Sequence, residues 1–189
     1  NGVLQAAPTV TAGPPLVFAG ITVPGNGDAV LVYQARANEF ASPLADGTIT
    51  NTVTVTGGGL TGPVTASETV TVESGPDLTI TKTISPAQVA DNGRVTYTFL
   101  IQNRGNEAVT ATDDAVITDT FDPILTDLVV TYNGTPWTEG VNYTYDPATG
   151  LFTTIPGQIT VPAADFTRNP DGSYTATPGT AVLTVTGTI

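Results

Sequence analysis

Lys82 is the only lysine of the chain, and it stands in a segment whose alternate residues are apolar. Because successive side chains of a strand point to opposite faces, a strand at 77–86 would carry Lys82 on its apolar face. Lysine is rarely buried without a polar partner, so Lys82 is a candidate for ion pairing or covalent chemistry. Three apolar residues share its parity, namely Leu78, Ile80 and Ile84.

Two further polar residues stand on the apolar faces of predicted strands. In the segment 115–121, Asp119 shares the parity of two large apolar residues, and in 48–57 Asn51 alternates with isoleucine and valine. A buried lysine, a buried acid and a buried asparagine on separate strands are the residue types that a spontaneous Lys–Asn isopeptide bond requires. The candidate site therefore consists of Lys82, Asp119 and Asn51.

The chemistry of such a bond follows from burial. Apolar surroundings favour the uncharged amine of Lys82, which is then a nucleophile, and they also favour a protonated Asp119. That carboxyl would donate a hydrogen bond to the side-chain carbonyl of Asn51 and polarise it. Close packing supplies the high effective concentration that the attack requires. Ammonia is released once, so the reaction is a maturation step and not a catalytic turnover.

Other interpretations of the same residues stay open. Lys82 could form a buried ion pair with Asp119, or its ammonium could reach solvent at the edge of a sheet. Asn51 could hydrogen-bond a neighbouring backbone group.

Composition excludes several classes of function. The net charge of −12, from 17 acidic and five basic residues, repels nucleic acids and anionic membrane surfaces. Histidine and cysteine are absent, which rules out Ser-His-Asp and Cys-His catalysis, zinc–thiolate sites and disulfides within this chain. No apolar run reaches the roughly 18 residues that a membrane-spanning helix needs. We therefore expect neither enzymatic activity nor a cofactor, and no membrane insertion.

Two clusters are weak candidates for ligand binding. Asp113, Asp114 and Asp122 offer carboxylates for calcium, but they lack the spacing of a calcium loop and suit strand ends and turns. Four aromatic residues could stack on sugar rings, although packing across a hairpin is the commoner use of such residues. These residues are Tyr132, Trp137, Tyr143 and Tyr145.

The elements that must position these side chains are predicted to be strands. Thr and Val, which are β-branched and suit strands, dominate the alternating segments, and Asn-Gly and similar pairs separate them. This pattern predicts an all-β fold of tandem antiparallel Ig-like β-sandwich modules. The clearest predicted strands lie at 48–57, 67–74, 77–86, 94–103, 115–121 and 180–189.

Ser74-Gly75-Pro76 is the best candidate for a domain boundary, because proline cannot donate to a ladder and glycine lets the chain turn. We expect 1–74 to be the C-terminal part of a first module, 75–76 a linker, and 77–189 a second module that lacks its closing strands. An internal repeat supports this division. It aligns 20–37 with 157–189 and Asn1-Gly2 with Asn133-Gly134.

Four motifs occur in a specific order along the chain. In this order they resemble the repeat of bacterial surface proteins known as domain of unknown function eleven. The resemblance covers most of 77–130 and about 20–74, and it departs from the family in that no closing strand follows Ile189. The motifs are Thr81-Lys82-Thr83, the hairpin from Gly93 to Gly105, Thr118-Asp119-Thr120, and ITNTVTVTG at 49–57.

The resemblance implies an Ig-like or prealbumin-like sandwich from a stalk, adhesin or fibre, located outside the cell or on a bacterial surface. In the family's usual arrangement, Lys82 would bond to a closing strand, which here must come from another copy or from a segment beyond this sequence. We therefore expect a structural subunit that self-associates head to tail by strand complementation. The alternative is an adhesin module that binds a glycan or a host protein.

Overall fold

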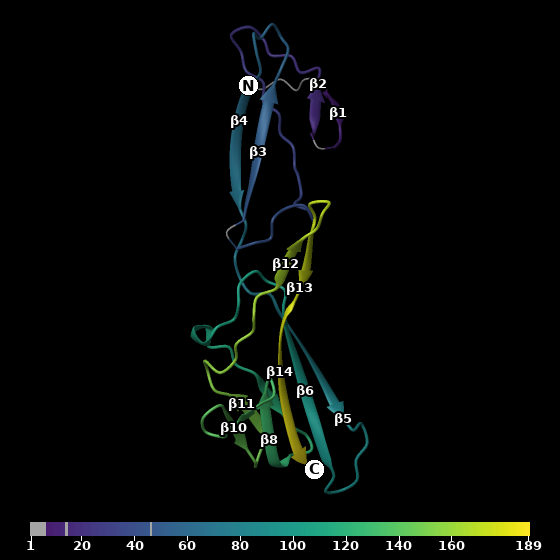
Figure 1. Ribbon diagram of the computed structural model, residues 1–189, viewed down its shortest axis with the longest axis vertical. Coiled ribbons are helices and arrows are strands. Elements are labelled where there is room, and N and C mark those ends of the chain that lie inside the picture. The colour runs from purple at the N-terminus through teal and green to yellow at the C-terminus, as the bar shows by residue number, and fades with distance from the viewer. Residues whose placement is uncertain (1–6, 14, 46) are drawn as a thin grey trace. The chain divides into compact units, whose positions relative to one another are not determined.

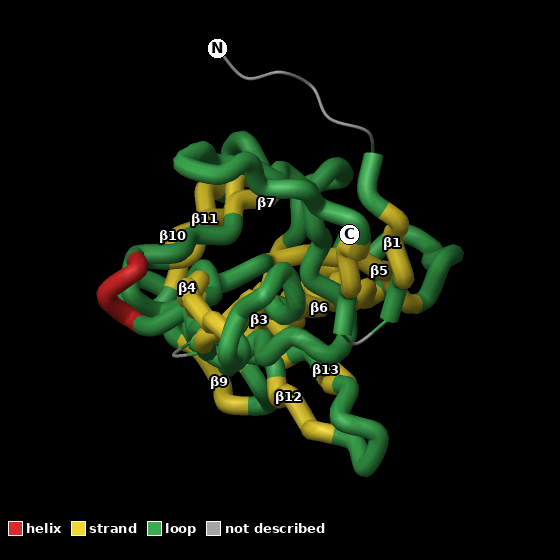
Figure 2. The backbone as a smooth tube through the Cα atoms, turned by 90° about the horizontal axis from the view of Figure 1, so that it is seen from above, coloured by secondary structure: helices red, strands yellow, loops and turns green. Residues whose placement is uncertain are grey.

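The computed structural model describes residues 7–13, 15–45 and 47–189. These residues form an all-β structure of small antiparallel sheets, which confirms the predicted fold class. Figure 2 shows strands joined by loops, with the 3-10 turn η1 (Ala111–Asp113) as the helical stretch of the described part. The chain divides into two compact units, Asn1–Arg36 and Ala37–Ile189. The predicted linker at 75–76 lies inside the second unit, and the division into two modules stays a prediction.

In the first unit, β1 (Thr9–Thr11) and β2 (Val17–Ala19) form an antiparallel pair. The ring of Phe18 lies 5.5 Å from that of Tyr33. The segment 20–37, which the repeat aligns with 157–189, forms no strand and is exposed. Its valines and leucine have no opposing sheet within the described part of this unit, so sequence similarity does not produce the same structure. Asn1-Gly2 lies outside the described residues.

A two-stranded hairpin opens the second unit. It consists of β3 (Thr48–Val55) and β4 (Val64–Thr71), which pair along their whole length (Figure 1). Hydroxyl pairs across the strands, such as Thr52 with Ser67 at 2.8 Å, add lateral hydrogen bonds. Nearly all of its side chains are exposed on both faces.

The largest sheet has five strands in the order β5-β6-β14-β8-β9. In β6 and β14 every second residue is buried, as the alternating sequence predicts. The hairpin turn between β8 and β9 uses Asn133-Gly134, both at positive φ, as the Asn-Gly signal predicts. The strands are β5 (Leu78–Ser85), β6 (Arg94–Asn103), β14 (Gly179–Thr188), β8 (Thr126–Tyr132) and β9 (Thr135–Trp137).

A three-stranded sheet, ordered β10-β11-β7, packs against the five-stranded sheet and closes the core. Phe121, which follows β7, joins the two layers, with ring centroids 4.9 Å from Tyr97 of β6 and 6.0 Å from Phe152 of β11. A separate hairpin pairs β12 with β13. These strands are β10 (Tyr143–Asp146), β11 (Leu151–Thr154), β7 (Thr118–Thr120), β12 (Asp165–Arg168) and β13 (Tyr174–Thr177).

Candidate functional site

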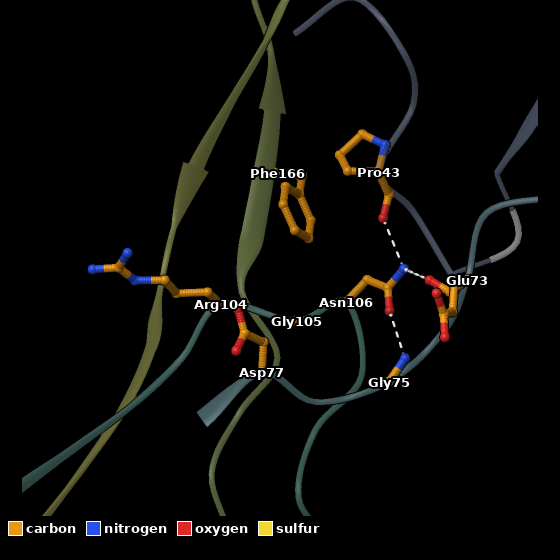
Figure 3. A pocket seen from close by; sticks show the side chains of 8 residues that line it. All are labelled: Pro43, Glu73, Gly75, Asp77, Arg104, Gly105, Asn106 and Phe166. Atoms are coloured by element: carbon orange, nitrogen blue, oxygen red, sulfur yellow. Dashed lines mark hydrogen bonds between the residues drawn. The ribbon is translucent and has the colours of Figure 1, made fainter. Parts of the chain in front are cut away.

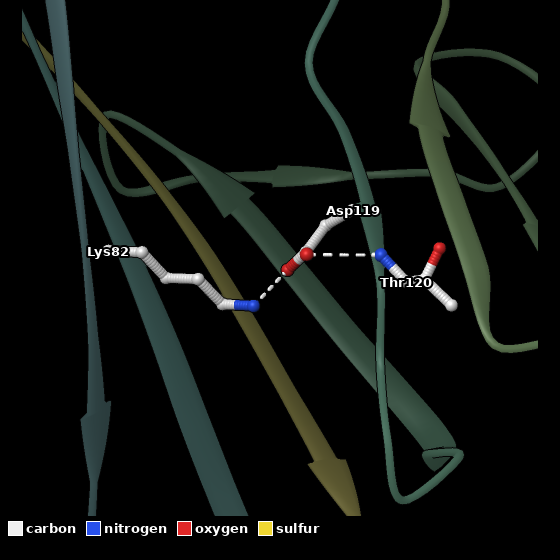
Figure 4. Close-up of polar contacts among 3 residues, drawn as sticks. All are labelled: Lys82, Asp119 and Thr120. Atoms are coloured by element: carbon white, nitrogen blue, oxygen red, sulfur yellow. Dashed lines mark hydrogen bonds and ion pairs between the residues drawn. The ribbon is translucent and has the colours of Figure 1, made fainter.

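The structure brings Lys82 and Asp119 together as an ion pair between the two sheets (Figure 4). Lys82 lies opposite Phe99 in the register of β5 with β6, and Phe99 is 3% exposed. Residues that are directly opposite in a ladder share a face, so Lys82 lies on the core side of its strand, as its parity predicts. Its Nζ contacts Oδ2 of Asp119 on β7.

Asp119 is held in place by its own strand. Its Oδ1 accepts a hydrogen bond from the backbone N–H of Thr120 at 3.0 Å. Its Oδ2 is buried and makes no hydrogen bond within the described structure, so the Lys82 ammonium is the group that balances its charge. The side chain of Asp119 is 18% exposed, whereas that of Lys82 is 40% exposed. The carboxylate of the pair is thus mostly shielded from solvent, whereas the lysine side chain is still in contact with it.

Three aromatic rings surround the ammonium. The Nζ of Lys82 lies 4.6 Å from the ring centroid of Tyr97, 5.4 Å from that of Phe121 and 5.6 Å from that of Phe99. Ring faces attract a cation within about 6 Å, so these contacts add to the ion pair. Sequence reasoning found the two charged groups but missed the rings; the inward parity of Tyr97 and Phe99 in 94–103 was the signal that could have found them.

The partial exposure of Lys82 reflects an open side of the sandwich. Among the described strands, β5 pairs with β6 alone, so its other edge has no partner. Ile80 is 53% exposed although it points to the core side of the sheet. A shallow apolar groove of about 180 Å³ runs between β5 and the segment 115–117. Its lining is Leu78, Thr79, Ile80, Ile101, Ala115, Val116, Ile117 and Ile159.

Asn51, the third residue of the predicted site, lies elsewhere in the fold. It stands on β3 opposite Glu68 of β4, in a sheet that contains neither Lys82 nor Asp119. Neighbouring residues of its parity, such as Val53, are exposed. The predicted inward orientation of Asn51 is therefore not realised, because no second layer covers either face of this hairpin within the described residues.

The arrangement can support an ion pair and leaves room for a further strand beside it. The ion pair with Asp119 is present and the Lys82 side chain is at the same time 40% exposed, so neither of these two interpretations excludes the other. The isopeptide bond stays a prediction that needs an asparagine from another segment.

The weak calcium candidates are not assembled into a site. Within the described residues, no group of three or more acidic, histidine or cysteine side chains is placed to hold a metal ion. Asp113 instead closes the turn η1. Its carboxylate accepts hydrogen bonds from the backbone N–H and the hydroxyl of Thr110, and these bonds lower its pKa in that order of importance. Asp114 adopts a left-handed backbone conformation at the end of the same turn, and Asp122 precedes a proline.

The aromatic cluster contributes to the core. Tyr132 and Tyr143 are 7% and 4% exposed, and Trp137 and Tyr145 pack partly buried against the same core. The hydroxyl of Tyr132 donates to the carbonyl of Thr160 at 2.8 Å. These residues do not form the exposed aromatic patch that would favour a glycan-binding adhesin.

No helix within the described residues has the length and hydropathy that a membrane crossing needs. No protein-family model, curated protein or solved structure matches the chain. The resemblance of 77–130 to the surface-protein repeat therefore stays a prediction from the motifs.

Proposed function

We propose that this chain is a non-enzymatic structural subunit of an extracellular or cell-surface stalk or fibre, assembled head to tail by strand complementation. The observation that carries the proposal is the open side of the sandwich at β5. Within the described residues that strand has one unpaired edge, and the apolar residues on its core-side face are exposed. An edge of this kind is a template for pairing with a strand of another chain.

The hairpin in the region 38–74 of a second copy is the donor that fits best. Its strand β3 is uncharged, and its valines and isoleucine lack a covering layer within the described residues. A two-stranded hairpin of this kind gains stability from a third strand. The contact joins different surfaces of the two copies, so repetition produces a fibre unless it closes into a ring.

The donor strand β3 and the acceptor strand β5 have the same order of apolar and polar side chains on one face. In β3 an asparagine stands between Ile49 and Val53, as Lys82 stands between two isoleucines in β5. If Asn51 lies opposite Lys82 in the joined sheet, the apolar residues that flank Asn51 in β3 lie opposite the isoleucines that flank Lys82 in β5. The resulting pocket would enclose the ion pair, which is open to solvent from the side of the lysine.

An isopeptide bond could follow this docking. The ammonium of Lys82 would first give a proton to Asp119, so that the neutral Nζ could attack the Cγ of Asn51; the new C–N bond would replace the bond to Nδ2, and ammonia would leave. Asp119 would carry the proton from the amine to the departing nitrogen. An intact mass under denaturing conditions would show a ladder of covalently joined chains, each junction lighter by one ammonia.

Two substitutions on β5 test the assembly. Ile80→Lys puts a charge on the open face, and Thr81→Lys puts the same charge on the opposite face of the same strand; both wild-type residues are exposed. Light scattering and negative-stain microscopy should show assembly of the wild type and of Thr81→Lys, with Ile80→Lys remaining monomeric. A wild-type chain that stays monomeric at high concentration, or equal loss in both variants, contradicts the proposal. A monomer that binds glycans would instead support the adhesin alternative.

A further inference from the structure

Arg104, Gly105 and Asn106, which follow β6, lie beside the backbone that leads from β4 into β5 (Figure 3). This backbone, 73–77, contains a Gly-Pro pair, which usually marks a flexible connection. Here it is hydrogen-bonded by two side-chain amides, those of Asn103 and Asn106, and Gly105 packs directly against it.

Both the nitrogen and the oxygen of the Asn106 side-chain amide form hydrogen bonds. Its Nδ2 donates to the carbonyls of Pro43 and Glu73, at 2.9 and 3.0 Å. Its Oδ1 accepts from the backbone N–H of Gly75 at 3.0 Å. Asn106 thus joins both ends of the hairpin segment to the loop after β6.

Asn103 is fully buried and makes four hydrogen bonds. Its Oδ1 accepts from the backbone N–H groups of Asp77 and Gly105, both at 2.9 Å. Its Nδ2 donates to the carbonyls of Glu107 and Pro162, at 2.7 and 3.0 Å. Both donors and both acceptor positions of the amide are used, so no other residue type of this size would satisfy the site.

Gly105 allows the two backbones to approach. A Cβ at this position would lie 2.1 Å from the carbonyl oxygen of Gly75 and 2.5 Å from the nitrogen of Asp77. Further backbone bonds fix the loop on both sides, from Arg104 N–H to the carbonyl of Asp77 at 2.8 Å and from Ala164 N–H to that of Gly105 at 2.9 Å.

From these contacts we infer that the loop 103–106 is a clamp that makes the β3–β4 hairpin and the sandwich move as one body. The inference is independent of assembly, because every contact lies within one chain. The amide of Asn106 bonds the backbone of Pro43, Glu73 and Gly75, so its removal frees both ends of the hairpin, while Asp77 stays bonded to Asn103 and Arg104 and the two sheets keep their own ladders. The clamp would hold the hairpin at a fixed place on each subunit.

Backbone ¹⁵N relaxation of the full chain tests the clamp, at a concentration at which light scattering gives a monomer. In the wild type, amides of β3 and of β6 should report one common correlation time. In Asn106→Ala, the β3 amides should report a shorter time than the β6 amides, and Gly75 should lose protection from hydrogen exchange. Asn142→Ala is the matched control, because it removes an amide that makes two bonds inside the sandwich.

A second variant, Asn106→Asp, tests the donor bonds of the amide separately. Asn106→Asp retains the acceptor for Gly75 but places a carboxylate against two carbonyls, so it should also separate the two correlation times at neutral pH. Separate times in the wild type, or a common time in both Asn106 variants, would overturn the inference. Equal separation in Asn142→Ala would overturn it as well.

Discussion

Two strands with similar sequences, β3 and β14, have opposite surroundings. Both alternate threonine with valine or other apolar residues. In β14 the apolar side chains Leu183 and Val185 are completely buried, whereas in β3 Val53 is 54% exposed. The alternation is sufficient to make a strand in both places, but a core forms only where a second layer covers the apolar face.

The difference arises from the neighbours of each strand. β14 is hydrogen-bonded to β6 on one side and to β8 on the other, with the three-stranded sheet packed over it. β3 pairs with β4, and nothing described covers its faces. β5 stands between these cases, because one edge is paired and its core-side face is partly open. The open face of β5 and the uncovered faces of β3 are the two surfaces that the proposed assembly would bring together.

Among the predicted substitutions, the largest loss of stability is expected in β14. Leu183→Ala should lower the free energy of unfolding by about 2–5 kcal/mol, because it leaves a cavity in the core. Val53→Ala on β3 should change it by less than about 0.5 kcal/mol in the monomer. Urea unfolding followed by the fluorescence of Trp137, which packs against the core, measures both. A large loss in Val53→Ala at monomer concentration would mean that the faces of β3 are covered.

The ion pair should give an intermediate effect. Lys82→Ala leaves the buried Oδ2 of Asp119 without its cation, and the loss should be about 1–2 kcal/mol, since the lysine is partly exposed. A double-mutant cycle with Asp119→Ala separates the pairing from the loss of the lysine stem. Additive effects of the two substitutions would show that the pair contributes nothing.

Alkaline pH should lower the free energy of unfolding through Tyr143 of β10. Burial, and secondarily the charge of Glu139, raises the pKa of Tyr143 above its ordinary value of about 10. A raised folded-state pKa means that this contribution to stability is complete below about pH 10 and is lost as pH rises through the folded-state pKa. Urea midpoints measured across this range should fall, and Tyr143→Phe should reduce the fall. A midpoint that is constant with pH would be inconsistent with a buried phenol.

The smallest expected effect on stability comes from Asp146 in the turn between β10 and β11. Hydrogen bonds from the hydroxyl of Thr149, at 2.7 Å, and from the backbone N–H of Ala148 lower the pKa of the exposed Asp146. Its contribution is present above the unfolded pKa of about 3.9 and is lost as pH falls through the folded value. An NMR titration should place the Asp146 pKa below that of the unfolded chain, with Thr149→Ala raising it. An unchanged value in Thr149→Ala would exclude the hydroxyl as the cause.

The strands predicted at 48–57, 77–86, 94–103 and 180–189 coincide closely with β3, β5, β6 and β14, whereas β4 begins and ends three residues before the strand predicted at 67–74, and only Thr118–Thr120 of the predicted 115–121 forms a strand. The predicted strand at 94–103 has the observed bounds of β6, and parity alone placed Lys82 on the core side of β5. The pairing of Lys82 with Asp119 was one of the alternatives that parity allowed. These features depend on local periodicity, which a single sequence contains.

The remaining features depend on contacts distant in sequence. β10 and β11 have only four residues each, and no alternating run marks them. The exposure of Lys82 depends on which strand lies beside β5, and local sequence does not determine this. Asn51 had the parity of a buried residue, but burial requires a covering layer that the described residues do not provide.

Hydrogen exchange along β5 at increasing protein concentration tests the central claim most directly. In an edge strand, alternate N–H groups point away from the paired neighbour and exchange quickly, whereas those bonded to β6 are protected. The account predicts that the outward N–H groups of β5 become protected as the chain assembles, while β6 and β14 keep the same rates. Outward groups of β5 that exchange equally fast in the monomer and in the assembled chain would contradict strand complementation.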